Sequence, residues 1–151
     1  MQPFSSDEPE FDAETYFGRF EEFRSVADPF KAFFTNKRIK EMQAMLERVD
    51  AEEKKRFEET GSRKIPRTRE EIKAIRTAQT VVSTAIHPDT KEMIPWWLRF
   101  SSFLPMNIPI CFGFIIAAPT PFNTIFWQWI NQTYNAALNY ANRNASSNYT
   151  T

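Results

Sequence analysis

The stretch that decides the fold runs from Phe100 to Asn142 and reads FSSFLPMNIPICFGFIIAAPTPFNTIFWQWINQTYNAALNYAN. None of these residues is Asp, Glu, Lys or Arg, although the chain of 151 residues holds 19 acidic and 19 basic side chains. Charged side chains keep a surface in water, so their absence over this length indicates a change of solvent rather than a change of fold. We interpret the stretch as the part that enters a lipid bilayer.

Two prolines, Pro119 and Pro121, divide the uncharged stretch into two pieces. A helix needs about 20 apolar residues to cross ~30 Å of hydrocarbon. The first piece, Phe100 to Ala118, is rich in Phe, Ile, Leu and Met and is predicted to form a membrane helix, kinked at Pro105 and Pro109. Such a break survives at membrane depth only where protein or water satisfies the freed backbone groups, so this helix is expected to have neighbours.

The second piece, Phe122 to Asn142, is long enough to span but much more polar, so one or two membrane helices are both compatible with the sequence. Four amide side chains of this piece recur along one side of a helix and form a stripe: Asn131, Asn135, Asn139 and Asn142. The first piece contains one amide, Asn107. In lipid, amides are satisfied by another helix or by a wet cavity, so these asparagines are predicted to face a partner or a pore. The alternative is an interfacial helix that shows its amides to water.

Tryptophans lie beside the first uncharged piece and within the second, and they are candidates for interfacial anchors. Trp96 and Trp97 lie just before the first piece, and Trp127 and Trp129 lie within the second. Indole rings favour the headgroup region, and an arginine such as Arg99 can extend its guanidinium to water. These residues are predicted to mark the membrane interface, within a membrane and interface region at 96–143 that a short polar tail at 144–151 follows.

Residues 1–95 hold nearly all the charge and are predicted to form a helical region outside the membrane. Thr35 or Asn36 can cap a helix that ends at Gly61, and its mixed charge run AEEKKRFEE is typical of a solvated face. Thr68 and Glu71 have the spacing of a capping box, which predicts a further helix that ends close to His87. The chain is therefore predicted to be all-α.

An aromatic ridge lies near the start of the chain, in the segment FDAETYFGRFEEF. Its aromatic side chains recur mostly three or four residues apart, on one side of a short helix: Phe11, Tyr16, Phe17, Phe20 and Phe23. The ridge packs either on the rest of its own domain or on a membrane surface or partner, and the sequence leaves both open.

The only histidine begins the segment His87, Pro88, Asp89 and Thr90. A metal site needs three or four ligands, and general-base catalysis needs a partner nucleophile; neither set is visible nearby, so a tight turn is predicted. The letters are superficially similar to the His-Pro-Asp loop of J-domain co-chaperones, a resemblance that would imply an Hsp70 partner. No catalytic residue, cofactor or metal is predicted, and the balanced charge does not favour a nucleic-acid partner.

Several motifs together resemble the sideroflexin family of mitochondrial inner-membrane proteins. They are the segment IHPDTKEMIP, the Pro- and Asn-containing span, Trp127-Gln-Trp129, Asn131-Gln132, and Asn139-Tyr-Ala-Asn142-Arg143, with a similar N-terminal stretch around Gly18-Arg19 and Asp28-Pro29. The resemblance implies an inner-membrane location in the mitochondrion and an association with the transport of serine and related amino acids. Members of the family are multispanning and about twice as long as this chain.

Function is predicted from this shorter length and from the asparagine stripe. We expect a truncated sideroflexin-like protein, not an enzyme, that acts as an accessory or structural subunit of a larger membrane protein complex. Its partners would be the bilayer, other membrane subunits or further copies of the same chain. The alternative is part of an amino-acid transporter that another chain or self-assembly completes.

Overall fold

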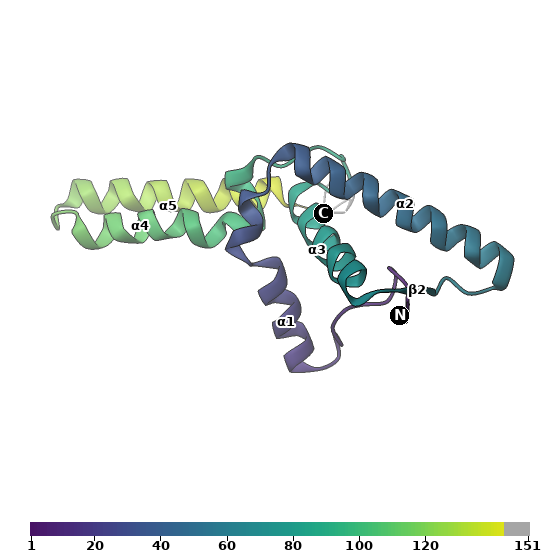
Figure 1. The fold of residues 1–151 in the computed structure, drawn as a ribbon. Coiled ribbons are helices and arrows are strands. Elements are labelled where there is room, and N and C mark those ends of the chain that lie inside the picture. The colour runs from purple at the N-terminus through teal and green to yellow at the C-terminus, as the bar shows by residue number, and fades with distance from the viewer. Residues whose placement is uncertain (144–151) are drawn as a thin grey trace, which may run out of the picture. The chain divides into compact units, whose positions relative to one another are not determined.

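A computed structural model describes residues 1–143, which form two compact units (Figure 1). Of the described residues, the first unit contains 1–26 and 34–83, and the second contains 27–33 and 84–143. Both units are built mainly from α-helices, so the predicted all-α class is confirmed. The predicted tail at 144–151 lies outside the described residues.

The helices of the first unit begin and end where local signals place them. Helix α2, Asn36–Thr60, is capped by Thr35, whose side chain accepts from the Arg38 amide, and ends at Gly61 in the left-handed conformation. Helix α3, Arg69–Ala85, carries the predicted capping box: Glu71 accepts from the Thr68 amide at 2.7 Å, and the Thr68 hydroxyl accepts from the Glu71 amide at 3.3 Å. Helix α1 covers Tyr16–Val26.

A short antiparallel ribbon completes the first unit, and the sequence did not indicate it. Strand β1, Gln2–Phe4, pairs with β2, Ile65–Arg67, so that Pro3 lies opposite Pro66. The pairing brings Phe4 into a buried cluster with Val49 of α2 and Ile75 of α3. The start of the chain is thus part of the core of this unit.

One residue of the charge run in α2 differs from the predicted solvated face. Glu53 is fully buried, and its carboxylate accepts hydrogen bonds from the Ser5 hydroxyl at 3.3 Å and from the Ser6 hydroxyl at 2.8 Å. The Ser6 amide adds a third donor at 3.0 Å. A buried carboxylate is stable only when such donors replace water, so Glu53 holds the segment after β1 in place.

The second unit is an antiparallel hairpin of two helices with 3₁₀ turns at its base (Figure 1). Helix α4 covers Phe103–Ile116 and α5 covers Pro121–Ala141. Three 3₁₀ helices accompany them: η1, Pro29–Phe33; η2, Trp96–Leu98; and η3, Phe100–Ser102. Thr120 caps α5 by accepting from the Asn123 amide at 3.3 Å, and Pro121 occupies the first turn, where its missing N–H costs nothing.

The first uncharged piece forms a shorter helix than the sequence predicts. Residues 100–102 make a 3₁₀ turn, in which the Ser102 hydroxyl donates to the Trp96 carbonyl, and α4 begins only at Phe103. With 14 residues it is roughly 21 Å long. The second piece forms α5 within one residue of its expected bounds. No helix within residues 1–143 is both long enough and apolar enough to cross a membrane.

Candidate functional site: the α4–α5 hairpin and its base

The segment from His87 to Thr90 is a tight turn that holds the histidine inward. The His87 ring is buried, and its Nδ1 accepts from the Asp89 amide at 3.2 Å and the Thr90 amide at 3.3 Å. Because Nδ1 accepts, the ring proton is on Nε2, which donates to the Arg143 carbonyl at 2.8 Å. His87 therefore fastens the turn to the end of α5, whereas Pro88 and Asp89 are exposed.

Arg99 differs from the predicted interfacial anchor because its side chain does not extend to water. It is 1% exposed, and its guanidinium donates to the Ile94 carbonyl at 3.2 Å and to the Ala32 carbonyl of η1 at 3.3 Å. Burial lowers the pKa of Arg99 below its usual value. The turn between η2 and η3 points the side chain into the unit, so Arg99 joins η1 to the base of the hairpin.

Two further contacts close the base of the hairpin. The Tyr134 hydroxyl donates to the Trp97 carbonyl at 3.2 Å, and the Asn142 amide group donates to the Leu98 carbonyl at 2.9 Å. Trp96 and Trp97 themselves are half exposed, at 51% and 39%. The base thus consists of backbone carbonyls that accept from polar side chains, of which Arg99 and Tyr134 are buried and Asn142 is exposed, with two indole rings at its surface.

The asparagine stripe does not form the contact between α4 and α5. That contact is made by the neighbouring face of α5, where Tyr134 and Leu138 are buried against Ile110 of α4. Asn131 and Asn135 are half-buried and joined at 3.4 Å, whereas Asn139 is exposed. The role of these amides toward a partner or pore stays a prediction.

Gly113 allows the two helices to approach closely, which the sequence analysis missed. A Cβ atom at Gly113 would lie 2.4 Å from the ring of Trp127, so no larger residue fits without displacing that ring. Trp127 therefore packs on α4, whereas Trp129 is 65% exposed. The sequence held one sign of this close packing: Gly113, one of the chain's three glycines, stands among bulky residues in CFGFII.

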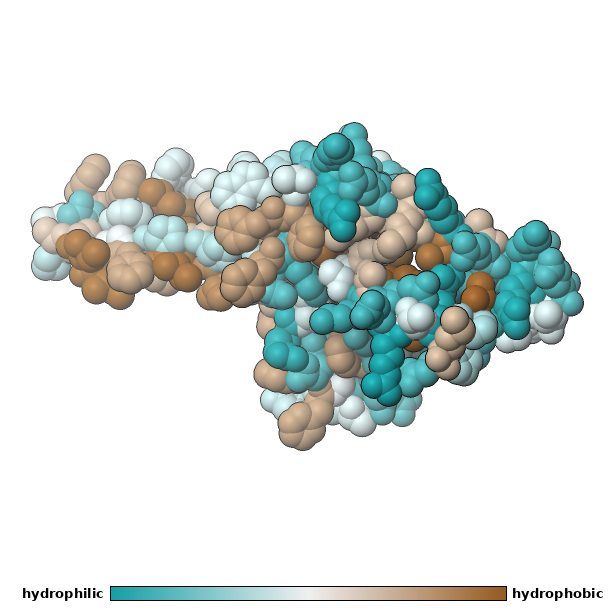
Figure 2. Space-filling model, in the orientation of Figure 1, coloured by the Kyte–Doolittle hydropathy of each residue, from teal (hydrophilic) through white to brown (hydrophobic). Residues whose placement is uncertain are grey.

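The outer surface of the hairpin carries no charge between residues 100 and 142 and is rich in large hydrophobic side chains, with exposed polar side chains among them (Figure 2). Large hydrophobic side chains on both helices are exposed to between 39% and 79%: Phe103, Leu104, Ile108, Phe112, Phe114, Ile115, Ile116, Phe122, Ile125, Phe126 and Trp129. The one cysteine, Cys111, is also exposed. Contiguous exposed apolar surface of this kind marks contact with a membrane or another protein.

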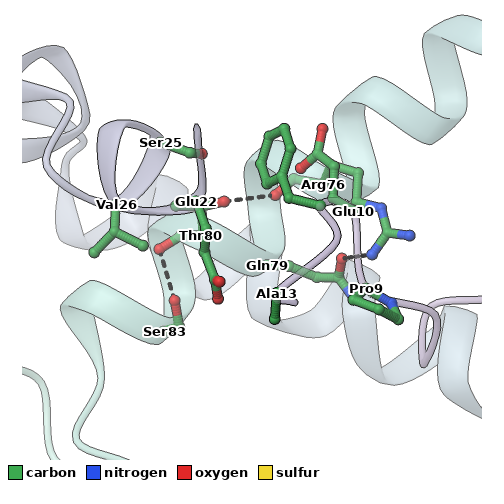
Figure 3. A pocket seen from close by; sticks show the side chains of 11 residues that line it. Pro9, Glu10, Ala13, Glu22, Ser25, Val26, Arg76, Gln79, Thr80 and Ser83 are labelled. Carbon is green, nitrogen blue, oxygen red and sulfur yellow. Dashed lines mark hydrogen bonds between the residues drawn. The ribbon is translucent and has the colours of Figure 1, made fainter. Parts of the chain in front are cut away.

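The first unit contains a cavity of about 300 Å³ between α1 and α3 (Figure 3). Two of its polar side chains are joined to each other and to the chain: Arg76 donates to Gln79 at 3.1 Å, and Gln79 donates to the Ser6 carbonyl at 2.9 Å. Among residues 1–143 no three His, Cys, Asp or Glu side chains gather as metal ligands. The hairpin and its base are therefore the candidate functional site.

Comparison with known proteins identifies the family. A sequence model described as "Sideroflexins" matches residues 5–151. The chain belongs to the sideroflexin family. It is 35% identical to sideroflexin-5 of Rattus norvegicus over 144 residues, which are 95% of this chain and 39% of the relative. It is also 38% identical to a sideroflexin of Dictyostelium discoideum over 137 residues, 91% of this chain and 38% of the relative.

A more distant member, sideroflexin-2 of Homo sapiens, is 32% identical over 97% of this chain and 42% of its own length. The chain thus spans about two fifths of the length of these sideroflexins. No solved structure matches it. The family match includes the segment from His87 to Thr90, which favours a sideroflexin turn over a J-domain loop.

Proposed function

We propose that this sideroflexin is a helical accessory subunit of a larger protein complex in the mitochondrial inner membrane. In this proposal α4 and α5 enter the bilayer together as a hairpin, which does not require either helix to cross it alone, with the outer surface of the hairpin against lipid and other helices. The observation that carries the proposal is that surface, which exposes large hydrophobic side chains on both helices and holds no charge on either. The location is the one that the family resemblance implies.

The polar side chains of the hairpin support an apolar setting because many of them bond within it. The amide group of Asn107 donates to the Phe103 carbonyl at 2.8 Å, and that of Asn123 donates to the Ala118 carbonyl at 2.9 Å. The Thr124 hydroxyl donates to the Thr120 carbonyl at 3.1 Å. A group that is satisfied internally can leave water at little cost.

The role of a subunit rests on how much apolar surface the hairpin leaves exposed. Its buried cluster contains only Ile110, Tyr134 and Leu138, with Leu98, Met106 and Ile130 packed around them. Two helices cannot cover the outward side chains of both, for example Ile115 and Phe122. Neighbouring membrane helices would cover part of this surface and take up the exposed amide of Asn139.

Membrane entry is tested by flotation of the full chain with liposomes of mitochondrial lipid composition. A variant with Ile115→Lys and Ile125→Lys places two charges on the outer surface and is expected to lose flotation, since charges at membrane depth are costly. The control adds the same charge at exposed positions of α2, Ala51→Lys and Ala44→Lys. Equal flotation of both variants would contradict membrane entry.

The subunit role is tested by native electrophoresis of inner membranes probed for this chain. Migration with a larger assembly, lost in the Ile115→Lys and Ile125→Lys variant, supports the proposal. Purification in mild detergent as a lone monomer, with no membrane protein attached, would contradict it. Migration as a small oligomer of this chain alone would also reject the subunit role and replace it with self-assembly.

A second candidate function is amino-acid transport, with this chain as one part of the transporter. It is favoured by one edge of α5, where Asn139 is exposed and Asn135 is half-buried, because amides of this kind can line a substrate path. Serine uptake into liposomes that requires this chain, and that falls when Asn139→Ala is introduced, would support transport. Uptake that is unchanged without the chain, with every partner present, would reject it.

A further inference from the structure

A cavity lies at the base of the hairpin, between the segment that follows His87 and the end of α5. Its volume is about 300 Å³, the size of a small ligand site. All the residues that line it belong to the second unit. Five of them carry polar groups, and these decide what the cavity can bind: His87, Thr90, Glu92, Tyr140 and Arg143.

Arg143 is held at this cavity by its backbone and by its side chain. Its carbonyl accepts from Nε2 of His87 at 2.8 Å, and its guanidinium lies over the ring of Tyr140, 3.7 Å from the ring centroid. Stacking on an aromatic face leaves the N–H groups at the edge of the guanidinium available. Among residues 1–143 these N–H groups have no acceptor, so Arg143 offers a positioned set of donors to a ligand.

Glu92 lines the same cavity and carries the opposite charge. Its backbone is fixed by the turn: its carbonyl accepts from the His87 amide at 2.9 Å, and its amide donates to the Thr90 hydroxyl at 3.4 Å. The exposed carboxylate forms no salt bridge with Arg143 or with any other residue in the described part of the chain. Two opposite charges that line one cavity without pairing suit a ligand that carries both signs.

The rest of the cavity wall is apolar. Ile94 is buried, and Met93 and Leu98 are half-buried. The half-exposed rings of Trp96 and Trp97 follow in sequence, and the uncharged stretch begins at residue 100. A ligand that fits this wall has an apolar part next to its two charges. A phospholipid has both parts, whereas a free zwitterion as small as serine lacks the apolar one.

We propose that this cavity binds the phosphoethanolamine headgroup of a phospholipid. The phosphate accepts hydrogen bonds from the Arg143 guanidinium and the Thr90 hydroxyl, and the ammonium group donates to the Glu92 carboxylate. The choice of a lipid over a free phosphorylated amine rests on the proposed membrane entry of the hairpin, whereas the need for both charges rests on the cavity alone. A bound headgroup would fix the base of the hairpin at the bilayer surface.

Native mass spectrometry of the full chain in mild detergent tests the inference. The probes are dihexanoyl phosphatidylethanolamine, dihexanoyl phosphatidylglycerol, free phosphoethanolamine and serine. We expect phosphatidylethanolamine to bind several-fold more strongly than the other three. Phosphatidylglycerol lacks the positive charge that Glu92 attracts, and free phosphoethanolamine lacks the part that contacts the apolar wall.

Two substitutions remove the two charges of the site separately. Arg143→Gln is expected to weaken the binding of both lipids about tenfold, because charged hydrogen bonds to the phosphate are lost. Glu92→Gln should weaken phosphatidylethanolamine several-fold and leave phosphatidylglycerol unchanged. The matched control is Lys91→Gln, which removes a positive charge from an exposed residue of the same turn that does not line the cavity. It should bind both lipids as the wild type does.

Three results would overturn the inference. They are equal loss of phosphatidylethanolamine in Lys91→Gln and Arg143→Gln, phosphatidylethanolamine binding that Glu92→Gln leaves unchanged, and binding of serine or free phosphoethanolamine as strong as that of the lipid. If Arg143→Gln does not fold, Glu92→Gln still decides, since its side chain is exposed. Binding in detergent needs no bilayer, so loss of flotation with this binding retained contradicts only membrane entry. Flotation without phosphatidylethanolamine binding contradicts only this site.

Discussion

The Nε2 atom of His87 donates a hydrogen bond to the carbonyl oxygen of Arg143, 2.8 Å away, across 56 positions of sequence. The same ring accepts two backbone N–H groups through Nδ1, from Asp89 and Thr90. One side chain thereby fixes both the shape of the turn and the end of α5. This double role gives a family motif a structural reason that needs neither catalysis nor a metal.

Replacement of His87 by alanine is expected to loosen the turn and the end of α5 together. The change removes the His87 hydrogen bonds to the amides of Asp89 and Thr90 and to the carbonyl of Arg143; because these residues are exposed and water can replace the ring, the expected cost is about 1 kcal/mol of unfolding free energy. Hydrogen exchange on the full chain in detergent would show faster exchange at both sites. The control is Glu92→Ala, because the contact of Glu92 with His87 is made by its backbone carbonyl. Faster exchange in the turn alone would contradict the link to α5.

Replacement of Gly113 by alanine is expected to push α4 and α5 apart. The new methyl group would lie 2.4 Å from the Trp127 ring, and overpacking of this kind costs about 1–3 kcal/mol. Adding Trp127→Leu should restore much of the loss, so the two substitutions together cost less than their sum. Unfolding free energies measured in micelles provide the test, with Ala118→Val in the exposed connection between α4 and α5 as control. Strict additivity would show that the ring does not meet Gly113.

Local signals predicted the helices well because a helix is bounded by residues close in sequence. Thr35, and Thr68 with Glu71, lie within three residues of the amides that they cap. The ribbon of β1 and β2 escaped notice because three-residue strands have no periodicity to read, and each contains a proline. Its existence depends on pairing across more than sixty positions, which no local pattern reports.

The candidate site was predictable in composition but not in contacts. The uncharged stretch and its two pieces follow from residue types alone, and α5 matches within one residue. Arg99 is not the interfacial anchor that the sequence predicts, because its partners include the Ala32 carbonyl, 67 positions away. Trp127 differs for a similar reason: its packing depends on Gly113, on the other helix. Whether such a side chain is buried or exposed depends on residues that are distant in sequence.

Replacement of Glu53 by alanine is expected to release the start of the chain from α2. The Ser5 hydroxyl and the amide and hydroxyl of Ser6 lose their acceptor, which costs about 1–3 kcal/mol where these groups stay buried. Limited proteolysis should then cut within residues 1–10 faster than in the wild type. Glu58→Ala, at an exposed position of the same helix, serves as control. Unchanged proteolysis would show that β1 is held by its strand pairing and by Phe4 alone.

The first unit is expected to lose stability only in strong acid. A hydrogen bond from Lys54, together with Lys54 and Arg63 charge, lowers the pKa of Asp50 below its usual 3.8. Hydrogen bonds from Thr68 lower the pKa of Glu71 below its usual 4.5. A carboxyl group with a lowered folded-state pKa stabilises the fold above its unfolded pKa, and this contribution is lost as pH falls through the folded value.

Unfolding midpoints should therefore stay level from neutral pH down to the usual carboxyl range and fall below it. In Asp50→Asn with Glu71→Gln, the midpoint at neutral pH should be lower and the decline in acid shallower, because neither group then titrates. Denaturant titrations between pH 7 and pH 2 measure both effects. The control is Glu47→Gln with Glu58→Gln, two carboxyls at exposed positions of α2. An equally shallow decline in the control would assign the acid response to the overall charge of the unit rather than to these two contacts.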